Sequence, residues 1–203
     1  MKDKLRLGIY GGTFSPPHVG HVNSAKDFVR EMKLDKLLVI PDNLPPHKFF
    51  DGEATVEDRL RMAELAFGSI ANTTVSDMEI RRGGKSYTYL TLEELSSEDT
   101  ELFFLCGTDM FLTLPEWRCP ERIFGLATIC CVRRECEREL GERIKAARER
   151  YEREYSARTY EISHAVDEIS STELRERLKR REGVEELIPK AVYEYIVERG
   201  LYL

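Results

Sequence analysis

Two histidines that share one short turn are the strongest chemical signal in this sequence. Residues 11–21 (GGTFSPPHVGH) follow an apolar run and lead into a segment of helical spacing, and they contain His18 and His21. Residues three positions apart are neighbours on one helix face, so both imidazoles can donate to the same phosphoryl group. Because the sequence has only four histidines, this pairing predicts a phosphate-binding turn.

The residues before the histidines suit the same chemistry. Gly11 and Gly12 allow unusual φ values and the close approach of a ligand to the backbone, and Thr13 offers a hydroxyl. The helix that begins after them has free N-terminal amides, which attract anions. The two common phosphate-binding patterns, G-x-G-x-x-G and G-x-x-x-x-G-K-[ST], are absent from this segment.

A second candidate phosphate segment lies near the C-terminus, at residues 169–175 (ISSTELR). Ser170 and Glu173 have the spacing of a capping box, which indicates that a helix begins here. The free amides of such a helix start can bind phosphate oxygens, and Arg175, one turn beyond Thr172, can bind the same anion. A plain helix cap explains Ser170 alone, but not its combination with Arg175 and the distant histidines.

These segments require a fold that brings distant turns together, and the hydrophobic pattern predicts one. Short β-rich runs alternate with longer segments of helical spacing. Strands are predicted at residues 5–10, 36–40, 74–80, 101–106, 127–132 and 159–162. Helices are predicted at residues 19–32, 56–68, 87–95, 137–155, from 170 onwards and at 189–199, with two short helical pieces around Pro115.

Right-handed crossovers then give an α/β fold, a doubly wound (Rossmann-like) and mainly parallel sheet with helices on both faces. Such a sheet binds ligands beyond the carboxyl ends of its strands. We expect residues 1–203 to form a single domain, with the helical part from about residue 169 to residue 203 packed on it.

The composition excludes several classes of function. Acidic residues outnumber basic ones, 37 to 31, for a formal net charge of −6, so a basic footprint for nucleic acid is missing. No apolar run approaches the roughly 20 residues of a membrane-spanning helix, and no signal peptide is visible, so we expect a cytoplasmic protein.

The five cysteines have no C-x-x-C pair, and those in apolar runs, Cys106, Cys130 and Cys131, are expected to be buried.

The two phosphate segments match the signatures of a known superfamily. T-x-x-x-x-H-x-G-H at residues 13–21 and I-S-S-T-x-x-R at residues 169–175 resemble those of the nucleotidyltransferases that are similar to class I aminoacyl-tRNA synthetases. Further matches resemble the bacterial nicotinate-nucleotide adenylyltransferase family. The opening G-G-T-F-x-P-x-H-x-G-H is met, although Ser15 stands where that family commonly has Asp and Pro17 where it has an aliphatic residue. The other matches are P-x-K at residues 46–48, S-Y-T-x-x-T-L at 86–92, G-x-D at 107–109 and L-P-x-W at 114–117.

This resemblance implies adenylyl transfer from ATP to nicotinate mononucleotide, with deamido-NAD and pyrophosphate as products. It implies catalytic roles for His18, His21, Lys48 and Arg175. It implies ATP and phosphate binding by Gly11, Gly12, Thr13, Phe14, Gly20, Gly107, Asp109, Ile169, Ser170, Ser171 and Thr172, and pyridine-nucleotide binding by Ser86, Tyr87, Thr88 and Trp117. Mg²⁺ is expected to arrive bound to ATP, without a dedicated set of protein ligands.

Two alternatives remain open at this point. The same phosphate motifs also suit an adenylyltransferase that acts on nicotinamide mononucleotide or phosphopantetheine, although residues 86–92 and Trp117 favour a pyridine nucleotide. The other alternative is a nucleotide-binding regulatory module, which the presence of both histidines, Lys48 and Arg175 disfavours. Taken alone, Trp117 also suits a core position and Lys48 a solvated loop.

Overall fold

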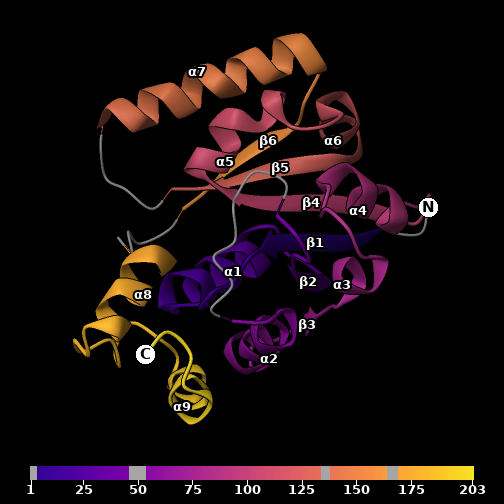
Figure 1. The fold of residues 1–203 in the computed structure, drawn as a ribbon. Coiled ribbons are helices and arrows are strands. Elements are labelled where there is room, and N and C mark those ends of the chain that lie inside the picture. Colours follow the sequence, from indigo (N-terminus) through magenta and orange to yellow (C-terminus); the bar gives the residue numbers. More distant parts are fainter. Residues whose placement is uncertain (1–3, 46–53, 134–137, 164–168) are drawn as a thin grey trace. The chain divides into compact units, whose positions relative to one another are not determined.

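The computed structural model describes residues 4–45, 54–133, 138–163 and 169–203 of the chain (Figure 1). Within these residues, strands and helices alternate along most of the sequence and the strands form one six-stranded sheet. The strands are β1 (Leu5–Gly12), β2 (Lys36–Pro41), β3 (Thr73–Val75), β4 (Thr100–Gly107), β5 (Ala127–Val132) and β6 (Thr159–Ile162). Five of the six predicted strands are therefore confirmed within two residues at each end.

The strand order is β3-β2-β1-β4-β5-β6, and the pairs β1 with β4, β4 with β5 and β5 with β6 run parallel. This is the order of a doubly wound Rossmann-type sheet, so the predicted α/β fold class is confirmed. The order reverses between β1 and β4, where the register pairs Tyr10 with Leu105. In such sheets ligands bind beyond the carboxyl ends of the strands at this switch point.

The chain divides into two compact units, which we describe separately. Unit 1 comprises residues 1–10, 27–37 and 87–166, and unit 2 comprises residues 11–26, 38–86 and 167–203. Helix α1 (Val19–Glu31) begins in unit 2 and ends in unit 1. The organisation of residues 1–203 as a single domain stays a prediction.

Unit 1 is built on the strands β4, β5 and β6. Its helices are α4 (Thr88–Leu95), α5 (Thr108–Thr113), α6 (Pro120–Leu126) and α7 (Arg138–Tyr155), with a 3₁₀ turn η1 (Leu114–Glu116). The side chains of β4 from Leu102 to Cys106 are all buried, as expected for a parallel strand with both faces covered. Helix α7 packs on α5 and α6 and lies beyond them in Figure 1, and its Arg148 donates to Thr159 Oγ1 of β6 at 3.2 Å.

Unit 2 contains the helices α2 (Val56–Phe67), α3 (Met78–Arg82), α8 (Ser171–Lys179) and α9 (Lys190–Arg199). Helix α2 begins with a full capping box, in which Thr55 and Asp58 each accept from the other's backbone N–H. Its buried face packs against β3 and α9. Helix α9 ends at Gly200, whose φ of 64° lies in the left-handed region that favours glycine after a helix.

Two local predictions are wrong, and one helix was not predicted. The third strand was expected over residues 74–80, but β3 ends at Val75 and Met78–Arg82 is helix α3. Ser76 and Asp77 start that helix, since the Ser76 hydroxyl accepts from the Met78 N–H and Asp77 pairs with Arg81 one turn on. Helix α6 was not predicted, although Pro120 occupies its first turn, where proline is favoured. Gly11 and Gly12 continue strand β1 instead of forming a turn.

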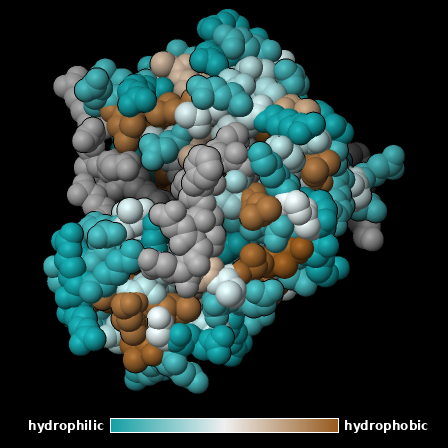
Figure 2. All heavy atoms as spheres, in the orientation of Figure 1, coloured by the Kyte–Doolittle hydropathy of each residue, from teal (hydrophilic) through white to brown (hydrophobic). Residues whose placement is uncertain are grey.

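The surface is consistent with the high charge content. The face in Figure 2 is mostly hydrophilic, and its apolar side chains form small separate groups. In the part of the chain that the structure describes, no helix combines the length and the apolar character that crossing a membrane would need. The exposed large apolar side chains are scattered in sequence, as Leu5, Leu44, Tyr160, Val197 and Leu203.

Candidate active site

The histidine turn in unit 2 orients one imidazole with the backbone of the other. The backbone N–H of His18 donates to Nδ1 of His21 at 3.2 Å, and the two rings lie 3.7 Å apart between centroids. An imidazole nitrogen that accepts a hydrogen bond carries no proton, so in neutral His21 the proton is on Nε2. His21 therefore offers an Nε2–H donor. His18 is fully buried, and His21 is 9% exposed.

Phe14 supports this turn and explains one of the two glycines. It has a positive φ of 49°, and its ring packs edge-on against His21 with centroids 5.4 Å apart. A Cβ atom on Gly12 would lie 3.0 Å from the Phe14 ring, so only glycine fits there without displacing that ring. Neither Gly11 nor Gly12 has a positive φ, so the expectation that they supply unusual φ values is wrong and Phe14 has that conformation instead.

The two predicted phosphate segments come together in unit 2. Ser171 Oγ donates to the Pro16 carbonyl at 3.0 Å, and the Arg175 guanidinium donates to the Ser15 carbonyl at 2.8 Å. Arg175 also donates to Thr172 Oγ1 at 3.3 Å. The start of α8 is thus bonded to the turn before the histidines, about 155 residues away in sequence.

The start of α8 retains capacity to bind an anion. Ser170 caps the helix by accepting from the Glu173 N–H, which confirms the predicted cap. A guanidinium has five N–H groups, and the contacts to Ser15 and Thr172 account for two of them. Ile169, just before the cap, is half-buried.

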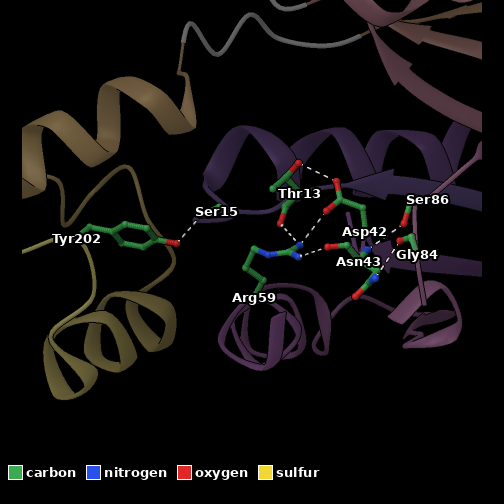
Figure 3. A network of polar contacts seen from close by, with 8 residues as sticks. All are labelled: Thr13, Ser15, Asp42, Asn43, Arg59, Gly84, Ser86 and Tyr202. Atoms are coloured by element: carbon green, nitrogen blue, oxygen red, sulfur yellow. Dashed lines mark hydrogen bonds and ion pairs between the residues drawn. The ribbon is translucent and has the colours of Figure 1, made fainter. Parts of the chain in front are cut away.

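Thr13 is bonded within the protein, which the sequence did not indicate. Its hydroxyl donates to Asp42 Oδ2 at 2.8 Å, and the other carboxylate oxygen of Asp42 accepts from Arg59 at 3.0 Å (Figure 3). A hydroxyl has one proton, so in this arrangement Thr13 has only lone pairs left. Asp42 and Arg59 were missed. One signal could have found Arg59, because it occupies the same helix face as Met62, Ala63 and Ala66, all of them buried.

The C-terminal residues close on the same turn. Ser15 Oγ and Tyr202 Oη are 2.7 Å apart and both side chains are buried (Figure 3). The Val19 N–H donates to the Leu187 carbonyl. Gly20 lies in the first turn of α1, where its carbonyl accepts from Ser24 Oγ at 2.7 Å. These contacts hold the entry into α1 from the side of the C-terminal segment.

The residues predicted to bind the pyridine nucleotide, together with Gly107 and Asp109, lie mostly in unit 1. Gly107 ends strand β4, and Asp109 is exposed in the first turn of α5. Thr88 begins α4, while Tyr87 is its N-cap and forms no side-chain cap hydrogen bond. Trp117 is half-buried and meets Phe104 edge-on with ring centroids 6.3 Å apart.

Tyr87 also lies under a cation. The guanidinium carbon of Arg118, next to Trp117 in the chain, is 4.9 Å from the centre of the Tyr87 ring. A guanidinium over an aromatic face is a favourable cation–π contact. The contact brings the S-Y-T segment and the L-P-x-W segment together within unit 1. Ser86, by contrast, lies in unit 2, where its Oγ accepts from the Asn43 N–H at 2.9 Å.

Lys48, which was predicted to be catalytic, lies outside the described residues. Within the residues that the structure describes, no group of three or more His, Cys, Asp or Glu side chains is arranged to bind a metal ion.

Comparison with known proteins agrees with the motifs. The model of the cytidylyltransferase-like family matches residues 9–177. A probable nicotinate-nucleotide adenylyltransferase from Desulfatibacillum aliphaticivorans is 38% identical over 218 aligned residues, which cover 98% of this chain and 100% of that protein. A protein of the same description from Listeria monocytogenes is 33% identical, with 98% of each chain covered.

Solved structures show the same fold. The nicotinic acid mononucleotide adenylyltransferase of Plasmodium falciparum, complexed with NaAD, matches with a TM-score of 0.72 at 17% identity and covers 97% of each chain. A putative nicotinate-nucleotide adenylyltransferase from Vibrio parahaemolyticus matches with a TM-score of 0.63 at 19% identity, over 97% of this chain and 94% of that one. The chain therefore belongs to the cytidylyltransferase-like family and, within it, to the nicotinate-nucleotide adenylyltransferases.

Proposed function

We propose that this protein transfers the adenylyl group of ATP to nicotinate mononucleotide, forming deamido-NAD and releasing pyrophosphate. The single observation that carries the proposal beyond family membership is the hydrogen bond from the His18 N–H to His21 Nδ1. It fixes the orientation of the His21 ring in the turn that follows β1 and places the proton of the neutral ring on Nε2. Acceptor-dependent release of pyrophosphate tests the proposal directly.

The chemistry needs no general base. A phosphate oxygen of the mononucleotide attacks the α-phosphorus of ATP, and the bond from that phosphorus to the oxygen bridging to the β-phosphate breaks. The attacking monoester is already an anion, because its second pKa is about 6. The protein therefore has two tasks, to align the two phosphates and to stabilise the charge that develops on the equatorial and leaving oxygens.

We assign the α-phosphoryl oxygens to His21 Nε2–H. An imidazole held by the backbone of its own turn loses little freedom when it donates, which is the property of a preorganised donor. His18 supplies the backbone N–H that fixes His21. The predicted contact of the His18 ring with the phosphate region stays a prediction, since that ring is fully buried in the chain as described.

The β- and γ-phosphates are assigned to the start of α8. Arg175 is the main charge there, and the first-turn amides after Ser170 add the positive end of a helix. Because the hydroxyl proton of Ser171 goes to Pro16, we expect its backbone N–H to contact phosphate. We also assign Lys48 to the triphosphate.

Gly11, Gly12, Thr13 and Phe14 form the backbone beside the α-phosphate in this proposal. A Cβ on Gly11 would meet nothing closer than the Ile40 carbonyl at 4.0 Å. Nothing within the described chain requires glycine at this position, which suits a glycine retained for the close approach of a ligand. The substrate is MgATP, whose phosphate oxygens and water supply the hard oxygen ligands that Mg²⁺ prefers.

The pyridine nucleotide is assigned to Ser86, Tyr87, Thr88 and Trp117. Helix α4 begins at Thr88 without a side-chain cap hydrogen bond, so we assign the substrate carboxylate to the amides of Thr88 and Tyr89, where the helix dipole favours negative charge. This favours nicotinate over nicotinamide mononucleotide, whose carboxamide is neutral. A half-buried indole such as Trp117 can stack on the pyridine ring. Gly107 and Asp109, at the end of β4, are assigned to the nucleotide.

A further inference from the structure

Arg59 is an unusual residue for its position in helix α2. It is 0% exposed and is the largest of the fully buried side chains that the structure describes. Burying a guanidinium costs free energy unless it is paired and hydrogen-bonded. The neighbouring buried positions on this helix face are apolar, for example Met62 and Ala63, so packing alone does not require an arginine here. Its contacts show what it holds together.

The guanidinium bridges the ends of two neighbouring strands. Its Nη1 donates to the Thr13 carbonyl and to Asp42 Oδ1, both at 3.0 Å, and its Nη2 donates to the Asn43 carbonyl at 3.1 Å (Figure 3). Asp42 is also bonded to the end of β1 and the residue after it. Its Oδ2 accepts from Thr13 Oγ1, and its N–H donates to the Gly12 carbonyl. The backbone of the histidine turn is thus fixed relative to the segment after β2.

The same network continues to Ser86. The Asn43 N–H donates to Ser86 Oγ at 2.9 Å, and the Asn43 side-chain amide donates to the Gly84 carbonyl at 2.9 Å (Figure 3). The Ser86 N–H donates in turn to the Leu44 carbonyl. The position of Ser86 therefore depends on the position of Asn43, which Arg59 holds by its carbonyl.

We infer that Arg59 is a positioning residue that sets the turn at Thr13 and the segment at Ser86 in one common frame. The inference rests on the proposed function, in which the turn at Thr13 binds ATP phosphates and Ser86 binds the pyridine nucleotide. Arg59 contacts neither substrate. Only a planar guanidinium can donate to two carbonyls and a carboxylate at once, whereas the single ammonium of lysine cannot span them.

The principal variant is Arg59→Lys, which keeps the charge opposite Asp42. Two matched controls separate positioning from stability. Arg61→Lys changes an exposed arginine of the same helix that pairs only with Glu64 among the contacts shown. Tyr195→Phe removes a hydrogen bond to the buried Asp58, also in α2, and so lowers stability near Arg59 without touching its network. Thermal melting is recorded for each variant, and rates are normalised to folded protein.

The readouts are the KM for nicotinate mononucleotide and the Kd for α,β-methylene-ATP, an analogue that cannot transfer its adenylyl group. Arg59→Lys is expected to raise both by about tenfold or more, as small displacements of substrate-positioning groups do. Both controls should leave them within about twofold of the wild type. If Arg59→Lys lowers the melting temperature as Tyr195→Phe does but leaves both constants within about twofold, Arg59 is merely structural and the inference is overturned.

Two further arms keep the test decisive. Asn43→Ala removes the side-chain bond to the Gly84 carbonyl but keeps the backbone bond from Asn43 to Ser86 Oγ. Loosening Gly84, two residues before Ser86, should raise the KM for the mononucleotide while the Kd for α,β-methylene-ATP stays unchanged. If both stay unchanged, the contact with Gly84 does not position Ser86, and that part of the inference is overturned even where Arg59→Lys does not fold. If the wild type releases no pyrophosphate with nicotinate mononucleotide, the proposed function fails. In that case the Kd for α,β-methylene-ATP still decides whether Arg59 positions the phosphate turn.

Discussion

The backbone N–H of His18 donates to Nδ1 of His21 across 3.2 Å, so the orientation and the tautomer of His21 are set by the turn that contains it. The sequence shows only the spacing of the two histidines, whereas this hydrogen bond shows how the His21 ring is oriented. The useful atom is Nε2 of His21.

Replacing His21 should separate the two ring nitrogens. His21→Ala removes the donor and is expected to lower kcat by about 10²–10³-fold with little change in KM, as for other oxyanion donors. The amide of His21→Gln reaches the position of Nε2 and should retain more activity than His21→Asn, whose amide reaches only the position of Nδ1. Steady-state pyrophosphate release measures the series. Equal rates for the Gln and Asn variants would contradict the assignment of Nε2.

The bond between Ser15 and Tyr202 should contribute to stability. Ser15 Oγ and Tyr202 Oη are 2.7 Å apart in a buried site, and a net hydrogen bond is worth about 1 kcal/mol. Tyr202→Phe and Ser15→Ala should each lower the free energy of unfolding by about that amount or more, and the double variant should cost less than their sum. Urea unfolding measures all three. Strict additivity would show that the two hydroxyls do not interact.

The carboxyl of Asp58 should make the free energy of unfolding depend on pH. Burial alone would raise the pKa of its carboxyl, but hydrogen bonds from Thr55 and Tyr195 and the charge of Arg199 outweigh burial and lower that pKa. A carboxyl with a depressed folded pKa contributes stability above its unfolded pKa of about 3.9, and this is lost as the pH falls through the folded value. The contribution is therefore complete at pH 7 and declines below about pH 4.

Tyr195→Phe should expose this contribution. The variant should be less stable than the wild type by about 1 kcal/mol at pH 7, and the difference should shrink below about pH 4. Tyr193→Phe is the matched control, because Tyr193 donates to the exposed carboxylate of Glu185 instead and exposed pairs contribute little. Urea unfolding at pH 7 and pH 3 measures both variants. A difference in the free energy of unfolding that is larger at pH 3 than at pH 7 would contradict the lowered pKa of Asp58.

The cysteines should differ sharply in reactivity. Cys106, Cys130 and Cys131 are buried, as predicted, while Cys119 is partly exposed. Burial raises the pKa of Cys131 to about 12, with a further contribution from Glu161, and burial also raises the pKa of Cys106 and Cys130. Since the thiolate is the reactive form, iodoacetamide at pH 8 should label Cys119 long before these three. Mass spectrometry of the native and urea-unfolded protein checks this order, and early labelling of Cys131 would contradict it.

Sequence periodicity correctly predicted the elements that are buried in a uniform way along their length. The apolar run of β4 and the stripe of α7 each predict a single element, because a strand buried on both faces and a helix buried on one have distinct periods. Residues 74–80 misled because Val75, Met78 and Ile80 alternate loosely enough to resemble a strand. The chain leaves the sheet after Val75, where Ser76 and Asp77 favour a helix start over another strand residue.

In the candidate site, too, some residues could be predicted from the sequence and others could not. The histidine turn and the start of α8 could be predicted because each motif is local and contains its own phosphate-binding groups. The network around Arg59 could not, since Asp42 lies 17 residues and Thr13 lies 46 residues from Arg59. The hydrophobic periodicity of a segment contains no information about contacts between residues so far apart in the sequence. The hydrogen bond between Ser15 and Tyr202 spans 187 residues and was missed for the same reason.

The most direct test of the proposed function is pyrophosphate release by the purified protein with MgATP and each of three acceptors in separate reactions. The acceptors are nicotinate mononucleotide, nicotinamide mononucleotide and phosphopantetheine. We predict the highest kcat/KM with nicotinate mononucleotide, because its carboxylate suits the uncapped start of α4 at Thr88. A higher kcat/KM with either of the other acceptors, or no release with any of the three, would contradict the proposed function.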